Sequence, residues 1–193
     1  MAKKVGVLAL QGDFAEHETA LGRAGAAPVQ VRLPRDLAGV EALVIPGGES
    51  TTICRLMDVF DLSGEIEGRV RDGMPTWGTC AGLIVLAASL TDDRPKPLGL
   101  MDVRVQRNGY GRQVDSFEAD LHVPELGNDA FRAVFIRAPV IAEVGPGVKT
   151  LACLDDGSVV AVRQRNILAT SFHPELTGDH RFHSYFLSMA SEE

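Results

Sequence analysis

The pentapeptide GTCAG, residues 78–82, joins a strand-like stretch that ends in PTWGT to a run of helix formers, LIVLAASL. It matches the G-x-S-x-G nucleophile elbow, with cysteine in place of serine. Such a turn is strained and crowded, and glycine tolerates the close approach of strand and helix. We therefore expect a strand, a sharp turn at Cys80 and a helix over 83–90. The alternative is a buried cysteine in a tight turn, without a chemical role.

The same strand-to-helix order recurs before the elbow. Apolar runs typical of buried strands alternate with segments whose apolar residues follow helical spacing. This alternation predicts a mostly parallel sheet with helices on both faces, a flavodoxin-like three-layer α/β fold. The expected strands are 5–10, 28–33 and 41–48, and the expected helices lie over 14–24, 50–60 and 63–71.

The second half of the chain is richer in short strands. Asp156-Gly157 is a typical hairpin turn between two of them, and a last helix is expected over about 179–190. The expected strands are 100–106, 117–123, 133–139, 151–155, 158–164 and 167–172. No linker or repeat divides the sequence, so we expect residues 1–193 to form a single domain with a mixed sheet.

Composition narrows the function classes. The net charge of −7 argues against a general nucleic-acid or anionic-membrane binder, and no run approaches the roughly 18 apolar residues of a membrane span. Three scattered cysteines suit a reducing cytoplasm better than a disulfide framework. Cys54 and Cys153 lack the glycine context of Cys80, so we expect both in the core.

A cysteine nucleophile needs a base, and SFHPEL, residues 171–176, is the best candidate among the five histidines. His173 and Glu175 are two residues apart at the end of an apolar strand, so extended backbone would place them on the same side. Glu175 would orient one imidazole nitrogen while the other faces Cys80, which completes a Cys–His–Glu triad. The alternative is a surface turn without chemistry.

A third element is PGGEST, residues 46–51, where a glycine pair ends a strand before a helix. Backbone N–H groups of Gly47 and Gly48, together with that of Ala81, would form an oxyanion hole. A simple connection in which Ser50 or Thr51 caps the helix is the blander interpretation, and both can hold together.

A metal site is the weaker interpretation of the C-terminal polar residues. The ligand-type side chains are close in sequence, but H-E-x-x-H and paired cysteines at ligand spacing are absent, and so are nucleotide-binding glycine motifs. A solvated face at the start of the last helix is favoured, and no metal is expected. The residues concerned are His173, Glu175, Asp179, His180 and His183.

With PGGEST, GTCAG and SFHPE in this order, the chain resembles class I (triad-type) glutamine amidotransferases. Four further stretches make it similar to the glutaminase subunits of two-subunit pyridoxal 5′-phosphate synthases, and this resemblance runs end to end. These stretches are LALQGDFAEH (8–17), RNGYGRQVDSFEADL (107–121), FIRAP (135–139) and SFHPELTGDHRFH (171–183).

The resemblance implies roles for individual residues. Cys80 would be the nucleophile, His173 the acid/base and Glu175 its orienter. A glutamine-binding set is also implied, in which arginine would recognise the substrate α-carboxylate. The arginines could instead be surface charges or pair with Asp115 or Glu118. The implied substrate-binding residues are Gly48, Glu49, Ser50, Arg107, Ile136 and Arg137.

The implied activity is hydrolysis of L-glutamine to L-glutamate and ammonia, through a thioester on the cysteine. Ammonia would pass to a separate synthase subunit (PdxS type) in a large complex that makes pyridoxal 5′-phosphate, and this chain would bind no cofactor. Two alternatives stay open: a cysteine hydrolase of the DJ-1/PfpI type, and a scaffold that only regulates a partner.

Overall fold

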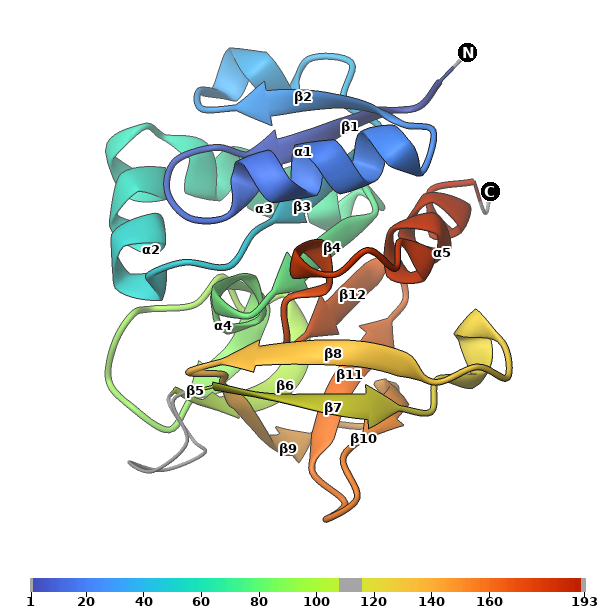
Figure 1. Cartoon of the computed structure of the whole chain (residues 1–193). Coiled ribbons are helices and arrows are strands. Elements are labelled where there is room, and N and C mark those ends of the chain that lie inside the picture. Colours follow the sequence, from blue (N-terminus) through green and yellow to red (C-terminus); the bar gives the residue numbers. More distant parts are fainter. Residues whose placement is uncertain (1, 108–115, 192–193) are drawn as a thin grey trace.

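The central feature of the computed structural model is a seven-stranded sheet, and the model describes residues 2–107 and 116–191. The strand order is β10-β11-β12-β4-β3-β1-β2 (Figure 1). The five strands from β12 to β2 are parallel, whereas β11 runs antiparallel to β12 and β10 antiparallel to β11. The strands are β1 (Lys4–Leu8), β2 (Ala27–Val31), β3 (Ala42–Ile45), β4 (Thr76–Thr79), β10 (Lys149–Cys153), β11 (Val159–Gln164) and β12 (Ile167–Thr170).

Helices cover both faces of this sheet, which confirms the expected α/β fold. Alternate residues of one strand face opposite cores. In β3, Leu43 and Ile45 belong to the core with α2, α3 and α4, while Ala42 and Val44 belong to the core with α1 and α5. The helices are α1 (Phe14–Arg23), α2 (Ser50–Val59), α3 (Leu62–Arg71), α4 (Ala81–Leu86) and α5 (Arg181–Met189), with short 3₁₀ turns η1 (Pro34–Leu37), η2 (Pro124–Leu126) and η3 (Pro174–Leu176).

Five strands leave the main sheet, a division that the sequence pattern does not show. One small sheet has the order β5-β6-β9, and β7 pairs with β8 as an antiparallel ribbon that crosses in front of β11 in Figure 1. The strands are β5 (Ala87–Leu90), β6 (Met101–Gln106), β7 (Ser116–Leu121), β8 (Phe131–Ile136) and β9 (Val140–Val144). Between β10 and β11 the chain turns at Gly157, which has a positive φ of 86°, so the expected hairpin is confirmed.

The helix expected over 83–90 is too long. Helix α4 ends at Leu86, and the next four residues form β5. The cause is the incoming segment 98–100, whose N–H groups donate to the carbonyls of Val85, Leu86 and Ala87 at 2.8–3.1 Å. Those carbonyls are thus bonded to another segment, and the chain continues extended beside β6.

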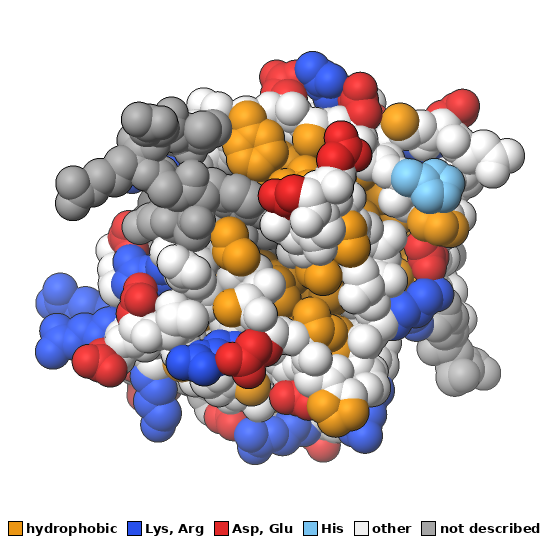
Figure 2. All heavy atoms as spheres, turned by 90° about the horizontal axis from the view of Figure 1, so that it is seen from below, with side chains coloured by type: hydrophobic (Ala, Val, Ile, Leu, Met, Phe, Trp, Pro, Cys, Tyr) orange, Lys and Arg blue, Asp and Glu red, His pale blue; other side chains and the backbone are white. Residues whose placement is uncertain are grey.

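The surface seen from the side of the smaller sheets is mixed in character. Figure 2 shows hydrophobic side chains in the middle of this face, with basic and acidic side chains interspersed around it. None of the helices that the structure describes is long and apolar enough to cross a membrane.

The sheet topology brings four loops to one edge. Strands β1, β3, β4 and β12 are parallel neighbours, so their carboxyl ends meet there. The segments that follow them begin the loops containing Gln11, Gly47, Cys80 and His173. Ligands of open α/β sheets bind outside the carboxyl ends of the strands, so this edge is the expected place for a site.

The glycines of the elbow are fixed by close packing. A Cβ on Gly78 would lie 2.5 Å from the carbonyl oxygen of Gly82, and one on Gly82 would overlap the carbonyl oxygen of Ile45. Helix α4 can therefore approach β3 and β4 closely only because both positions lack a side chain. This answers why glycines flank Cys80 on either side.

We predict that Gly82→Ala destabilises the protein, because the new methyl group meets rigid backbone; overpacking of this kind costs about 1–3 kcal/mol. Gly64→Ala is the matched control. Gly64 lies inside α3 with nothing within 4 Å of the added methyl, so the same change should stabilise by about 0.5–1 kcal/mol. Urea unfolding of both variants checks the opposite signs. Equal stability of Gly82→Ala and the parent would contradict the packing argument.

Candidate active site

Cys80 occupies the strained turn that its glycine context predicts. Its backbone has φ 48° and ψ −103°, outside the regions that non-glycine residues normally adopt. The N–H of Cys80 donates to Thr170 O at 2.8 Å, which ties the turn to the end of β12. Such strain persists only where the surroundings over-determine it, as close packing does here.

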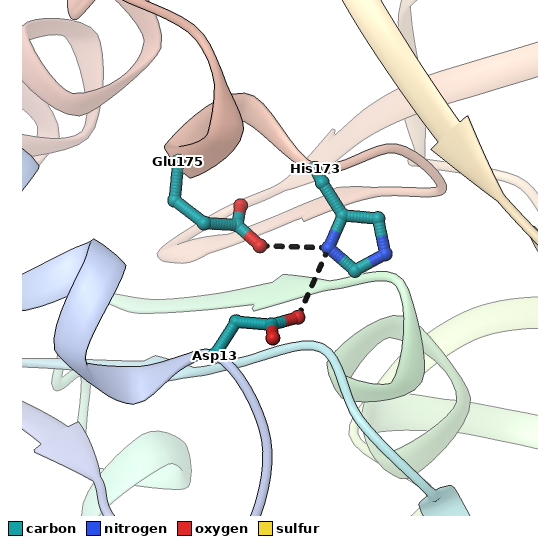
Figure 3. A group of neighbouring side chains, drawn as sticks. All are labelled: Asp13, His173 and Glu175. Atoms are coloured by element: carbon teal, nitrogen blue, oxygen red, sulfur yellow. Dashed lines mark hydrogen bonds and ion pairs between the residues drawn. The ribbon is translucent and has the colours of Figure 1, made fainter. Parts of the chain in front are cut away.

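His173 and Glu175 form the expected pair. His173 Nδ1 and Glu175 Oε1 are 2.7 Å apart, and Figure 3 shows the carboxylate directed at the ring nitrogen. The backbone route differs from expectation, because residues 174–176 form the 3₁₀ turn η3 rather than an extended strand. Pro174 favours this start, since its fixed φ suits the first helical position and its missing N–H is not needed there.

Asp13 is a second carboxylate at the same ring nitrogen, and the sequence reasoning missed it. Asp13 Oδ2 lies 3.3 Å from His173 Nδ1, and Figure 3 shows it approaching this nitrogen from a different direction than Glu175. It comes from the loop between β1 and α1, where its N–H donates to Gly47 O. Asp13 follows the first parallel strand, and polar residues after the carboxyl ends of such strands are candidates for a site, so the sequence did contain a signal.

The surroundings favour a protonated His173. Burial opposes the charge, but hydrogen bonds with Asp13, Cys80 and Glu175 outweigh it and raise the pKa of His173 to about 12. Burial raises the pKa of Glu175, and its hydrogen bond with His173 works against that rise. An imidazolium between a thiol sulfur and two carboxylates is the charge arrangement that stabilises a thiolate.

A pocket of about 340 Å³ opens in front of Cys80 and His173. All six residues expected to bind substrate line it, and so does Ala81. The pocket also includes positions that the sequence did not single out, among them Gln11 and the apolar Ile84, Pro139 and Leu176. The expected substrate-binding residues that line it are Gly48, Glu49, Ser50, Arg107, Ile136 and Arg137.

The two arginines of the pocket differ in their partners. Arg107 Nη1 donates to Arg94 O at 2.8 Å, and Nη2 lies 3.5 Å from Glu49 Oε1. Among the described residues, no hydrogen bond or ion pair holds the Arg137 guanidinium, and its backbone has a positive φ of 42°. Glu118, the suggested partner, pairs with Arg132 instead, and Asp115 lies outside the described residues.

The glycines after β3 approach the imidazole and the first loop. A Cβ on Gly47 would overlap the His173 ring, and one on Gly48 would lie 2.5 Å from Gln11 Oε1. Gln11 Oε1 also accepts from the N–H of Glu49 at 2.6 Å. Neither Ser50 nor Thr51 caps α2; Glu49 does, by accepting from the N–H of Thr51.

A buried polar cluster behind Glu175 was also missed. His17 Nε2 lies 3.3 Å from Glu175 Oε2 and 3.0 Å from Thr79 Oγ1, and His17 Nδ1 lies 3.2 Å from His183 Nε2. In the sequence, His17 and His183 read as members of helical faces, and only the packing of α1 against α5 brings them together.

The candidate metal ligands and the two other cysteines are the remaining groups that the sequence singled out. Asp179 pairs with Arg181, and three ligand-type atoms from Asp13, His173 and Glu175 lie within 4.8 Å of one another, held at hydrogen-bonding distances. Cys54 is half-buried, and burial together with Asp58 raises its pKa to about 11. Cys153 is exposed, so its expected place in the core was wrong.

Known proteins are similar to this chain in sequence and in fold. The model of the SNO glutamine amidotransferase family matches residues 7–192. The chain is 60% identical to "Pyridoxal 5'-phosphate synthase subunit PdxT" of Herpetosiphon aurantiacus (96% of this chain, 99% of that protein) and 56% identical to the PdxT of Dehalococcoides mccartyi strain BAV1 (97% of each). A crystal structure of a glutamine amidotransferase superposes with TM-score 0.91 at 49% identity, covering 97% of this chain and 99% of that one. This protein therefore belongs to the SNO glutamine amidotransferase family.

Proposed function

We propose that this protein is the glutaminase subunit of a pyridoxal 5′-phosphate synthase and hydrolyses L-glutamine to L-glutamate and ammonia. The observation that carries the proposal is the strained Cys80, which faces a His173 held by the buried Glu175 in a pocket with two arginines. The relatives named as synthase subunits support the assignment, since they match over nearly the whole chain.

In the first half of the reaction, the thiolate of Cys80 attacks the side-chain amide carbon of glutamine. The carbonyl electrons move to oxygen, and the imidazolium of His173 gives a proton to the leaving nitrogen. Ammonia departs and a γ-glutamyl thioester remains. Glu175 keeps the ring in place and stabilises its positive charge, because Oε1 lies 2.7 Å from Nδ1.

In the second half, the neutral His173 takes a proton from water, and the hydroxide attacks the thioester carbon. The intermediate collapses to glutamate and the Cys80 thiolate, with His173 protonated again. We assign the oxyanion in both halves to N–H groups of the Gly47–Gly48 segment and of Ala81. In support, no hydrogen bond among the described residues uses the N–H of Gly48 or Ala81.

The pocket rim supplies groups for the free amino acid. A guanidinium suits the α-carboxylate, and the carboxylate of Glu49 suits the α-ammonium. Hydrogen bonds with Thr51 hold the pKa of Glu49 below its usual range, with Arg107 and Arg137 acting in the same direction, so Glu49 is charged at neutral pH. Gly48 and Ser50 shape the backbone beside it.

Ammonia released into water is protonated and loses its nucleophilicity, so it has to reach an acceptor directly. We propose that a separate PdxS-type synthase subunit, in a large complex with this chain, uses it to build pyridoxal 5′-phosphate. In this proposal the cofactor is the product of the complex, and this chain holds neither cofactor nor metal. A cytoplasmic location fits a free catalytic thiol.

We predict that Cys80→Ala abolishes glutamate formation from L-glutamine, assayed with the synthase subunit present, because no other group can form the thioester. Cys153→Ala should keep full activity, since this exposed cysteine lies outside the pocket. Glutamate production that persists in Cys80→Ala would sink the proposal. Activity toward peptides or glycated substrates, without glutaminase activity, would favour the DJ-1/PfpI-type hydrolase. A complex that works equally well with Cys80→Ala would favour the scaffold.

For Arg137→Gln we predict a KM for glutamine raised by roughly 10- to 100-fold, because a charged hydrogen bond to the α-carboxylate is lost. The kcat should change little, since this contact is made in ground state and transition state alike. Arg132→Gln is the control: it is on the same strand as Ile136, but its exposed side chain pairs with Glu118 and Asp120. Steady-state kinetics of both variants test this, and an unchanged KM in Arg137→Gln would count against the role.

A further inference from the structure

The second carboxylate oxygen of Glu175, Oε2, makes no hydrogen bond with His173. We call Cys80, His173 and Glu175 the catalytic array. Oε1 bonds to His173, but Oε2 is buried and has no well-aligned hydrogen-bond partner in the described part of the chain. The nearest ring nitrogen is Nε2 of His17, at 3.3 Å. The same Nε2 lies 3.0 Å from Thr79 Oγ1, one residue before the nucleophile.

The tautomer of His17 follows from its surroundings. A carboxylate accepts only, so a neutral His17 beside Glu175 carries its proton on Nε2. Its Nδ1 then accepts from Nε2–H of His183, 3.2 Å away. The remaining atom, His183 Nδ1, is buried, has no hydrogen-bond partner among residues 2–107 and 116–191, and bears a lone pair, which avoids leaving an N–H donor unpaired. The opposite assignment would bury that donor and turn a lone pair toward Glu175.

We infer that His17 is a positioning residue of the catalytic array: its neutral ring bonds to Thr79 through Nε2, keeps the same nitrogen beside Oε2 of Glu175, and so fixes the acid/base His173 relative to the Cys80 elbow. The inference rests on the proposed glutaminase function for its kinetic part. Glu175 and His173 belong to the segment after β12, whereas Thr79 ends β4 and Cys80 follows it, and His17 of α1 contacts both segments.

The positioning role requires an uncharged His17. Burial, followed by the nearby His183 and His173, holds the pKa of His17 well below its usual value. A cation at this position would compete with the His173 imidazolium for the same carboxylate. A neutral N–H stabilises the charged Glu175 while leaving the full carboxylate charge for His173.

The pH dependence follows from the groups that face Glu175. These are His173 from its own turn, Asp13 from the loop before α1, and His17 from α1. The positive end of the Nε2–H dipole, 3.3 Å from Oε2, favours the ionised form of Glu175, so its removal lets Glu175 protonate at higher pH. The acidic limb of activity then moves to higher pH.

The test uses two amide replacements that differ in reach. In His17→Gln, the amide nitrogen extends to about the position of Nε2 and can still donate to Glu175 and Thr79. In His17→Asn, it reaches only the position of Nδ1 and cannot. Leu21→Ala is the stability control, because Leu21 is fully buried in the same helix but lies outside the array.

We expect His17→Asn to lose about 10- to 100-fold in kcat for glutamine with little change in KM, measured with the synthase subunit present. The acidic limb of its kcat/KM profile should move up by about one pH unit. His17→Gln should restore most of the rate and the limb. Leu21→Ala should have a lower melting temperature but an unmoved limb.

A second readout needs no glutamine. Alkylation of Cys80 by iodoacetamide is followed by mass spectrometry of its peptide. The pH profile of the alkylation rate should shift to higher pH in His17→Asn but not in His17→Gln. Two results would overturn the inference: an unmoved profile in His17→Asn, or equal losses in the Asn and Gln variants. If the alkylation shift appears while the parent makes no glutamate, the glutaminase proposal fails and the positioning role stands.

Discussion

The hydrogen bond between His173 and Glu175 must be satisfied inside the protein, and much of the architecture serves that requirement. The side chain of Glu175 is sealed from solvent, so its charge depends on protein groups alone. Those groups come from the loops after β1 and β12 and from α1, and α5 supports the last of them through His183. A parallel sheet supplies them because its strand ends converge at one edge.

Backbone hydrogen bonds join these loops before any side chain acts. Asp13 donates to Gly47, Cys80 to Thr170, and His173 to Val134 of β8. Backbone atoms therefore join the loop after β1 to the loop after β3, the turn at Cys80 to the end of β12, and His173 to β8. Rigid support of this kind is what a site needs if its reacting groups are to stay within hydrogen-bonding reach.

The sequence is informative where local rules hold. Gly-x-Cys-x-Gly predicts the elbow because only glycine fits against Ile45, and the unbroken apolar run of residues 42–45 predicts a strand buried on both faces. The sequence does not predict features that depend on contacts between distant segments. Helix α4 ends at Leu86 because the N–H groups of residues 98–100 donate to the carbonyls at its end. In the same way, Asp13 and His17 join the site through tertiary packing, and a histidine on a helical face gives no sign of its neighbours.

The position of β12 has a consequence for how the chain becomes active. This strand lies between β4 and β11 but begins 87 residues after Cys80 (167 − 80), and His173 follows it. During synthesis from the N-terminus, the cysteine emerges long before the strand to which its turn is anchored. A nascent chain therefore carries Cys80 without His173, its proposed acid/base partner, and without the hydrogen bond to Thr170. In the proposed reaction, this thiol is therefore ready to act only after the segment with β12 and His173 has folded against it.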